Sequence, residues 1–123
     1  MKQTLLDTSF ILSCINEKLD FFEELFLMGI QIIIPNLVIQ EIKKIIKSEK
    51  KMKTKNNAKL ALKIIQKNKF KKITLEKKHT DNALVEFLNK NKKIILATTD
   101  KELKKRVTNE ILVIRGKKKL KIL

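Results

Sequence analysis

The segment Ile94–Ala97 is an uninterrupted apolar run, with lysines before it and Thr98–Asp100 after it. A short run of this kind is typical of a central parallel strand that helices cover on both faces. Other short apolar runs alternate with segments whose apolar residues recur at helical spacing. The expected strands are 4–6, 31–34, 72–75, 94–97 and 111–114, and the expected helices lie near 9–15, 19–28, 36–46, 56–65, 81–88 and 101–107. This alternation predicts an α/β fold with a mainly parallel sheet and right-handed crossovers.

The chain has 123 residues, a length typical of one domain with one hydrophobic core. We therefore expect residues 1–123 to form a single unit. Its formal net charge is +16, which predicts attraction to phosphate polyanions. A lysine-rich composition can also accompany heat adaptation, but such surfaces usually pair lysine with glutamate. The excess of basic over acidic residues therefore favours a nucleic acid as the partner.

The basic residues are concentrated in the later part of the chain. Residues 1–42 carry 2 basic and 6 acidic side chains, whereas residues 43–123 carry 27 and 7. The region 47–55 is almost all lysine, and we expect it to be a mobile basic arm or a frayed helix end. A second basic segment, expected to be a C-terminal tail, begins at Arg115.

Several classes of protein are excluded by the composition. No apolar run is long enough to span a bilayer, and Asp7 interrupts any signal-peptide core, so we expect a soluble cytoplasmic protein with no membrane partner. Cys14 is the only cysteine and His79 the only histidine, which excludes a disulfide and a zinc site built on these residues. With only Gly29 and Gly116, the chain also lacks a glycine-rich phosphate loop.

Four acids occur where a strand ends or a helix begins: Asp7, Glu41, Asp81 and Asp100. Sites in open α/β sheets form beyond the carboxyl ends of the strands, so these side chains can face one crevice. Carboxylates brought together repel one another unless a cation neutralises them. Mg²⁺ or Mn²⁺, which prefer oxygen ligands, fit that need.

Each acid also has a purely structural explanation. Asp7 and Asp81 are suited to capping helices, and Thr99 with Glu102 matches a capping box that would make Asp100 a first-turn acid. Glu41 can be an ordinary surface residue. Taken together, these explanations do not account for acids recurring at equivalent positions in so basic a chain.

The chain resembles the PIN-domain nuclease family along essentially its whole length. The segments that carry the resemblance are Leu6–Ser9, Val38–Ile42, Thr80–Leu84 and Ala97–Leu103. The ending Arg115–Leu120 is similar to that of small archaeal PIN proteins related to the ribosomal-RNA-processing endonuclease of the small-subunit processome. One departure is Asn82, which follows Asp81 where the family often has a further acid.

The resemblance implies a three-layer α/β/α sandwich and a metal-dependent endoribonuclease that cuts single-stranded RNA, with precursor ribosomal RNA as the expected substrate. Asp7, Glu41, Asp81 and Asp100 would be the catalytic, metal-binding acids for Mg²⁺ or Mn²⁺. Polar helpers would come from Thr8 or Ser9 beside the first acid and from Thr98 or Thr99 beside the last.

Basic side chains near these acids are candidates for holding the RNA backbone. They are Lys43, Lys44, Lys47, Lys50, Lys51, Lys101, Lys104, Lys105 and Arg106. For any single lysine, a solvated helix face explains the charge equally well. With six Phe and no Trp or Tyr, base stacking is poorly supplied, so recognition is expected to depend on backbone charge and RNA shape.

Two other functions remain open from the sequence. A VapC-like toxin ribonuclease would share the same acids but would bind an antitoxin. A catalytically inactive RNA-binding factor in ribosome assembly would explain the charge without the acids. The sequence leaves open whether the chain forms a homodimer.

Overall fold

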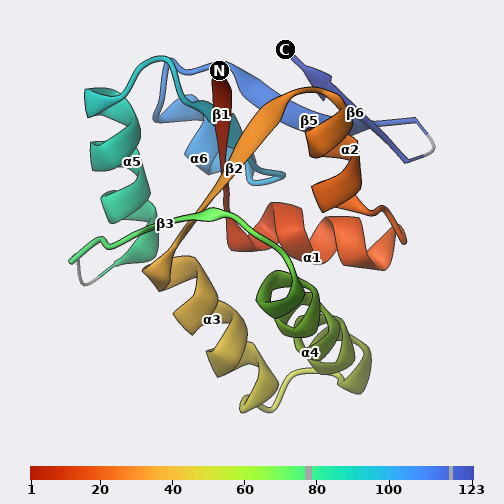
Figure 1. The fold of residues 1–123 in the computed structure, drawn as a ribbon. Helices are drawn as coiled ribbons and strands as arrows, with labels where there is room; N and C mark the ends of the chain where they lie inside the picture. Colours follow the sequence, from red (N-terminus) through yellow and green to blue (C-terminus); the bar gives the residue numbers. More distant parts are fainter. Residues whose placement is uncertain (77–78, 117) are drawn as a thin grey trace.

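A computed structural model of the chain describes residues 1–76, 79–116 and 118–123. The protein is built on one six-stranded sheet with the strand order β3-β2-β1-β4-β5-β6 (Figure 1). Every pairing is parallel except that of β6, which runs antiparallel to β5. The strands are β1 (Lys2–Leu6), β2 (Ile30–Pro35), β3 (Lys71–Ile73), β4 (Ile95–Ala97), β5 (Ile111–Arg115) and β6 (Lys119–Ile122).

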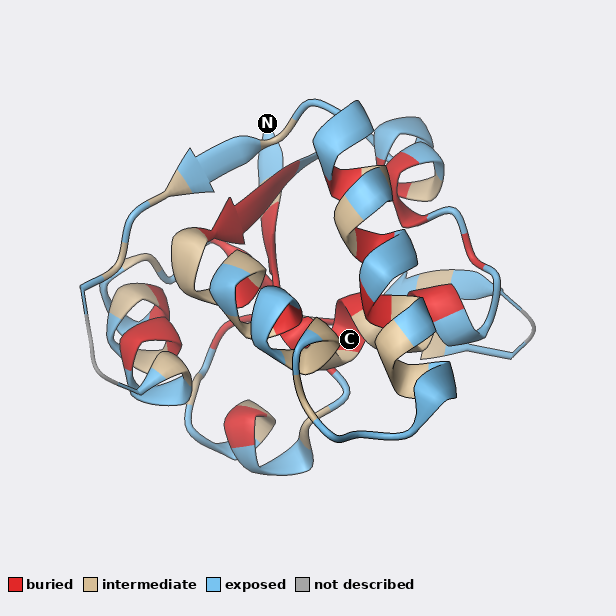
Figure 2. Cartoon of the chain, turned by 90° about the horizontal axis from the view of Figure 1, so that it is seen from below, coloured by how far each residue is buried: buried red, intermediate tan, exposed pale blue. Residues whose placement is uncertain are grey.

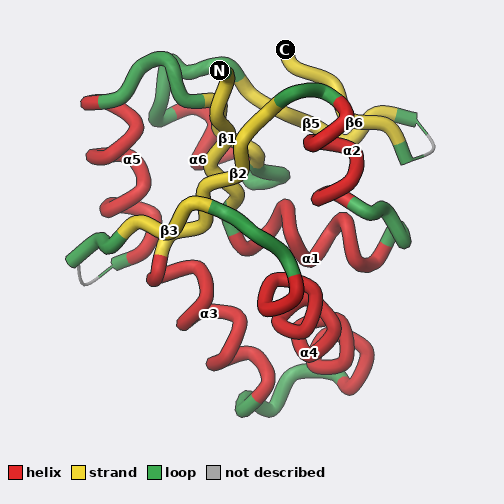
Figure 3. Tube along the Cα trace, viewed as in Figure 1, coloured by secondary structure: helices red, strands yellow, loops and turns green. Residues whose placement is uncertain are grey.

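Helices connect the parallel strands and cover both faces of the sheet, as the trace in Figure 3 shows. They are α1 (Thr8–Asn16), α2 (Phe21–Leu27), α3 (Asn36–Ile46), α4 (Met52–Lys67), α5 (Thr80–Lys90) and α6 (Lys101–Lys105). Helix α2 ends where sequence reasoning places its stop, because Gly29 adopts a φ of +71° that other residues rarely adopt.

The strands send alternate side chains into two separate cores. On β1, Leu6 packs with α1 to α4, whereas Leu5 packs with α5 and α6. On β4, Ala97 joins the first core and Leu96 the second. This two-sided packing gives three layers, α/β/α, and confirms the predicted fold class. Figure 2 shows the buried strands inside, while the outward faces of the helices are exposed.

The start of α4 differs from the prediction. The structure begins α4 at Met52, so the second half of the predicted 47–55 arm is helical, and Asn56, where the helix was expected to begin, lies inside it. Lysine is a good helix former, which explains the extension. Helix α4 packs beside α3 (Figure 1), with Ala58, Ala61 and Ile65 buried.

The predicted basic tail is also largely a strand. Residues Lys119–Ile122 form β6, which pairs with β5 from Leu112 to Arg115. Leu120 and Ile122 are half-buried, whereas Lys119 and Lys121 are exposed. Lys117, which belongs to the predicted tail, lies outside the described residues. Exposed lysines on such an edge strand discourage pairing with other chains.

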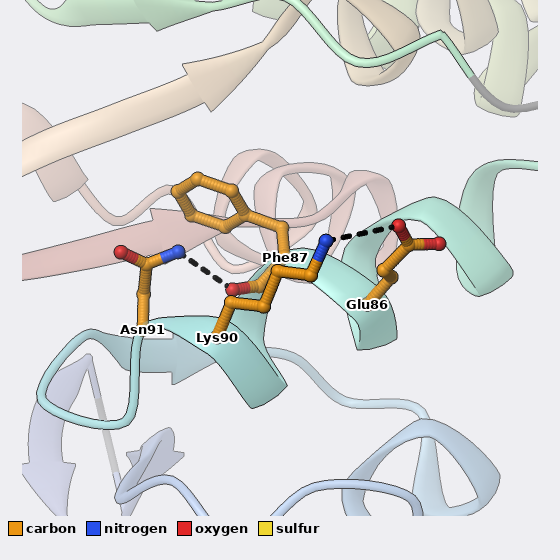
Figure 4. Close-up of polar contacts among 4 residues, drawn as sticks. All are labelled: Glu86, Phe87, Lys90 and Asn91. Atoms are coloured by element: carbon orange, nitrogen blue, oxygen red, sulfur yellow. Dashed lines mark hydrogen bonds and ion pairs between the residues drawn. The ribbon is translucent and has the colours of Figure 1, made fainter.

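Two side chains stabilise the C-terminal end of α5, drawn in Figure 4. Asn91 Nδ2 donates to the Phe87 carbonyl at 2.8 Å, which satisfies one of the carbonyls left unpaired at a helix end. Lys90 Nζ lies 3.4 Å from Glu86 Oε1, one turn earlier. The pair is exposed, so it stabilises the helix by less than about 1 kcal/mol.

The segment after β3 is tied to the start of α3. Asn36 Oδ1 accepts from the Leu75 backbone N–H at 2.8 Å, and Asn36 Nδ2 donates to the Leu75 carbonyl at 3.3 Å. This paired contact resembles one rung of a strand ladder and fixes the chain shortly before α5 begins. Among the described residues, no helix is long and apolar enough to cross a membrane.

We predict that Leu96→Ala lowers the free energy of unfolding by about 3 kcal/mol, because it leaves a cavity in the core under α5 and α6. Leu96 is fully buried on a central strand. Urea unfolding followed by circular dichroism measures the change. Leu60→Ala is the matched control, since Leu60 is 49% exposed and should lose much less. Equal losses in the two variants would contradict this packing.

Candidate active site

The carboxyl ends of β1 and β4 lie side by side at the centre of the sheet. The strand order reverses between them, because β1 leads outward to β2 and β4 leads outward to β5. Leu6 pairs with Ala97, and the backbone N–H of Asp7 donates to the Ala97 carbonyl at 3.1 Å. Such a switch point opens a crevice beyond the strand ends, which is where open α/β sheets bind ligands.

Asp7 is the buried acid of this crevice, with 6% of its surface exposed. Its Oδ1 caps α1 by accepting from the Phe10 N–H at 2.9 Å, and it also accepts from Ser9 Oγ at 2.9 Å. Its Oδ2 accepts from the Thr98 hydroxyl, which lies across the switch point on the segment after β4. Asp7 therefore joins the ends of two strands.

Ser9 and Thr98 extend this network to Asp100. Their hydroxyl oxygens lie 3.2 Å apart, and Ser9 Oγ accepts from the Thr99 N–H at 3.2 Å. Thr98 Oγ1 accepts from the Asp100 N–H at 3.0 Å. The two hydroxyls thus fix the backbone that carries the second acid of the crevice.

Asp100 is itself the N-cap of α6. Its Oδ1 accepts from the N–H groups of Glu102 at 2.9 Å and Leu103 at 3.3 Å. The expected capping box with Thr99 as the cap is therefore wrong by one residue. Capping occupies Oδ1, whereas Oδ2 accepts no hydrogen bond within the described part of the chain. Asp100 can therefore cap a helix and still offer an oxygen to the crevice.

Asp81 and Glu41 reach the same region from α5 and α3. Asp81 is the second residue of α5, with His79 as the N-cap, and Glu41 is half-buried on α3. Partial desolvation raises the pKa of Asp81, although the residue counts as exposed by surface area; Asp100 and Glu41 raise it further, and Arg106 lowers it. The charges of the acids thus act on one another in successive pairs: Asp7 with Asp100, Asp100 with Asp81, and Asp81 with Glu41.

Burial raises the pKa of Asp7 from 3.8 to about 6. The hydrogen bonds from Thr98, Phe10 and Ser9 lower the pKa and so limit the rise, while the negative charge of Asp100 adds to it. No described ion pair involves any of the four acids. The crevice therefore concentrates negative charge that no described lysine or arginine neutralises by direct contact.

The donor set fits a hard divalent ion. Within residues 1–76, 79–116 and 118–123, no group of three or more acids, histidines or cysteines is placed to hold a metal ion. Mg²⁺ does not need such a cage, because it usually keeps several waters and binds through one or two carboxylates together with substrate phosphates. Asp7 and Asp100, neighbouring acids in a partly dry crevice, match that requirement.

The predicted polar helpers divide into two groups. Ser9 donates to Asp7, the acid beside which it was expected. Thr98 was expected beside Asp100, but its hydroxyl donates to Asp7 and accepts from the Asp100 N–H. Thr99 contributes its backbone N–H, and its side chain is exposed. The Thr8 hydroxyl is buried and has no hydrogen-bond partner among the described residues.

The predicted basic residues lie at two distances from the acids. Lys101, Lys104, Lys105 and Arg106 follow Asp100 directly, on and just after α6. Lys43 and Lys44 lie less than one turn beyond Glu41 on α3. Lys47 lies about 9 Å from Glu41 along the axis of that helix. Lys50 and Lys51 lie still further, in the connection to α4.

Arg106 and Asn82 form a contact that sequence reasoning missed. Arg106 Nη2 donates to Asn82 Oδ1 at 2.8 Å, which joins the end of α6 to the start of α5. The two residues are 24 positions apart, and no sequence pattern links them. Only the packing of both helices on one face of the sheet brings them together.

A large hollow in the described part of the chain lies away from the acids. It has a volume of about 1100 Å³ and is lined mainly by apolar residues, including Phe21, Phe26 and Phe70. Met1, Ile30 and Lys71 also line it, which places it at the amino ends of β1, β2 and β3. None of the four predicted acids lines it, so we assign the candidate site to the crevice.

This fold is that of a PIN-like domain. The chain belongs to the family described as PIN like domain, whose model matches residues 4–119. It is similar to Ribonuclease VapC4 of Methanocaldococcus jannaschii, with 25% identity over 122 residues that cover 94% of this chain and 92% of the relative. The family resemblance predicted from the sequence is confirmed.

A solved structure supports the same assignment. The structure described as that of the PIN domain endonuclease Utp24 superimposes with a TM-score of 0.79 and 25% sequence identity. The match covers 98% of this chain and 90% of the other. The likeness therefore extends over nearly the whole chain.

We predict that Asp7→Asn stabilises the metal-free protein at neutral pH. Below the unfolded pKa of 3.8 the carboxyl is protonated in both states and costs nothing. As the pH rises through the folded pKa of about 6, the folded protein must hold a buried charge and loses stability. Asparagine avoids this loss, which is ~3 kcal/mol at most.

Urea unfolding in EDTA at about pH 4 and about pH 8 measures this effect, since the titration lies between them. Glu110→Gln is the control, because Glu110 is exposed at the amino end of β5. A gap between Asp7→Asn and wild type that does not grow from the lower to the higher pH would contradict the assigned burial cost.

We also predict that Thr98→Val raises the pKa of Asp7 above about 6, because the Thr98 hydroxyl is the hydrogen-bond donor that most lowers it. Carboxyl ¹³C chemical shifts followed through a pH titration report this value directly. Thr99→Val, which changes an exposed neighbouring side chain, should leave it unchanged. An unchanged pKa in Thr98→Val would argue against the hydrogen bond across the switch point.

Proposed function

We propose that the protein is a metal-dependent endoribonuclease that hydrolyses phosphodiester bonds of single-stranded RNA in the cytoplasm. The observation that carries the proposal is the meeting of Asp7 and Asp100 at the switch point of a PIN-like domain, with Asp81 near enough to feel the charges of Asp100 and Glu41. The names of the relatives, a ribonuclease and an endonuclease, support the reaction class.

Asp7 and Asp100 are the proposed holders of Mg²⁺ or Mn²⁺, and Asp81 and Glu41 are proposed to add negative charge that attracts the ion. Such an ion supplies an activated water and stabilises the charge that develops on the phosphate oxygens. The protein orients these acids through hydrogen bonds. The hydroxyls of Ser9 and Thr98 donate to Asp7, and the N–H groups of Glu102 and Leu103 donate to Oδ1 of Asp100. Asp7 is buried from solvent, and the low local dielectric strengthens its attraction for a cation.

RNA is proposed to bind through its backbone. Lys101, Lys104, Lys105 and Arg106 directly follow Asp100 on and after α6. Further basic residues continue along α3 and into the connection to α4: Lys43, Lys44, Lys47, Lys50 and Lys51. The excess of lysine raises the local concentration of a polyanion and makes binding dependent on salt. Precursor ribosomal RNA is the proposed substrate, supported by the likeness to the endonuclease Utp24.

A second candidate function is that of a VapC-like toxin, and the specific observation in its favour is the similarity to Ribonuclease VapC4. A toxin would arrest growth when expressed alone, and an antitoxin would relieve the arrest. An RNA-processing enzyme would not depend on such a partner. A catalytically inactive assembly factor, the third candidate, would bind RNA without cutting it.

We expect the purified protein to cleave single-stranded RNA with Mn²⁺ or Mg²⁺ and to lose this activity in EDTA. Asp7→Asn and Asp100→Asn should each lower the rate at least about 100-fold, since loss of even an indirect metal partner can cost that much. Gel analysis of end-labelled single-stranded and structured RNA measures the rate.

Glu110→Gln is the matched control, because it removes one exposed acid at the amino end of β5, whereas Asp7 and Asp100 follow the carboxyl ends of β1 and β4. It should cleave like wild type, and RNA binding should survive in all three variants. Equal cleavage by wild type and the Asp7 and Asp100 variants would point to a contaminating nuclease. Binding without cleavage by wild type would favour the assembly factor.

A further inference from the structure

Arg106 lies on the rim of the acid crevice and is held by one neutral side chain. It is the C-cap of α6, is exposed, and donates through Nη2 to Asn82 Oδ1 at 2.8 Å. Asn82 is the residue after Asp81 on α5. The contact therefore places a guanidinium beside the acid that α5 contributes to the site.

The charge of Arg106 is not cancelled by a partner. None of the described ion pairs includes Arg106, although its charge lowers the pKa of the nearby Asp81. A direct Arg106–Asp81 ion pair would neutralise both groups. Holding Arg106 through a neutral amide leaves Asp81 negative for a cation and Arg106 positive for an anion.

We propose that Arg106, oriented by Asn82, binds a backbone phosphate of the RNA strand next to Asp81. The proposal rests on the function proposed above and adds one defined subsite to it. Arginine is suited to this task because its planar guanidinium can bind phosphate through two parallel N–H groups. Only one described hydrogen bond engages the guanidinium, which leaves most of its five N–H donors for the RNA.

The neutral residue at position 82 is essential to this arrangement. Aspartate at that position would accept the same hydrogen bond and form an ion pair with Arg106. The pair would offer the phosphate a neutral group and would place another negative charge near the RNA. Asn82→Asp therefore distinguishes an anion subsite from a position where an extra acid would improve metal binding.

The test measures binding of a fluorescent oligouridine in EDTA, where cleavage does not interfere, across a series of salt concentrations. Arg106→Gln and Asn82→Asp should each weaken binding about tenfold, the loss expected for a charged hydrogen bond. For a single strand, loss of one phosphate contact should lower the salt dependence by about 0.7 in log–log slope. Arg106→Lys should lose affinity while keeping most of that slope.

Lys93→Gln is the matched control, since it removes one exposed charge before the amino end of β4, whereas Arg106 lies near the acids that follow the carboxyl ends of the strands. It should keep the wild-type affinity and slope. Circular dichroism melts check that every variant folds, and Arg106→Lys keeps the test valid should Arg106→Gln prove unstable. Wild-type affinity in both Arg106→Gln and Asn82→Asp would overturn the subsite.

Cleavage with Mn²⁺ is measured in parallel, so the two proposals can fail separately. Asn82→Asp that cleaves better at low Mn²⁺ and binds RNA like wild type would overturn the subsite and make position 82 part of the metal site. Wild type that binds RNA with the predicted variant losses but never cleaves would overturn the nuclease and leave the subsite standing. Wild type that fails to bind RNA would overturn both.

Discussion

The parallel pairing of β1 with β4 is the constraint on which the rest of the site depends. Because Leu6 lies opposite Ala97, the chain leaves both strands at the same level, and Asp7 comes to lie beside Thr98. The strands are 91 positions apart along the chain, yet their ends share one hydrogen-bond network. The cores on both faces of the sheet hold this register, so the geometry of the acids depends on apolar packing far more than on any contact between them.

The acids of the crevice show that structural and chemical roles can share one side chain. Asp7 and Asp100 each cap a helix with Oδ1, which orients the carboxylate and fixes the backbone around it. The structural explanation that the sequence offered for Asp7 is therefore correct, whereas Asp100 is the N-cap itself and not the first-turn acid of a capping box that starts at Thr99. Capping leaves Oδ2 of Asp100 without a described hydrogen bond, and it leaves Oδ2 of Asp7 to the Thr98 hydroxyl. A helix start at a strand end positions an acid at little conformational cost.

Charge is distributed so that opposite signs remain separate within a short distance. The four acids of the crevice form no described ion pair, and lysines lie on α6 and along α3, where only Lys105 has a described ion pair, with Glu102 of its own helix. Direct ion pairs between them would neutralise the groups that a cation and a polyanion require. The Arg106–Asn82 contact achieves this separation locally, because an amide accepts the hydrogen bond without cancelling the charge.

The sequence by itself determined the α/β class, the central strand at Ile94–Ala97 and the strand-end acids, because burial on two faces and helix starts leave local patterns. It also contained an overlooked signal for β6, since Lys119–Ile122 alternates polar and apolar residues with the period of a half-buried strand. The early start of α4 was missed because a run of solvated lysines suggests disorder. In the structure, packing against α3 stabilises α4, and the lysines extend its first turn. Tertiary structure alone decided that Asp7 meets Thr98 and that Asn82 meets Arg106, because strand order and helix packing bring together residues whose local sequences carry no trace of one another.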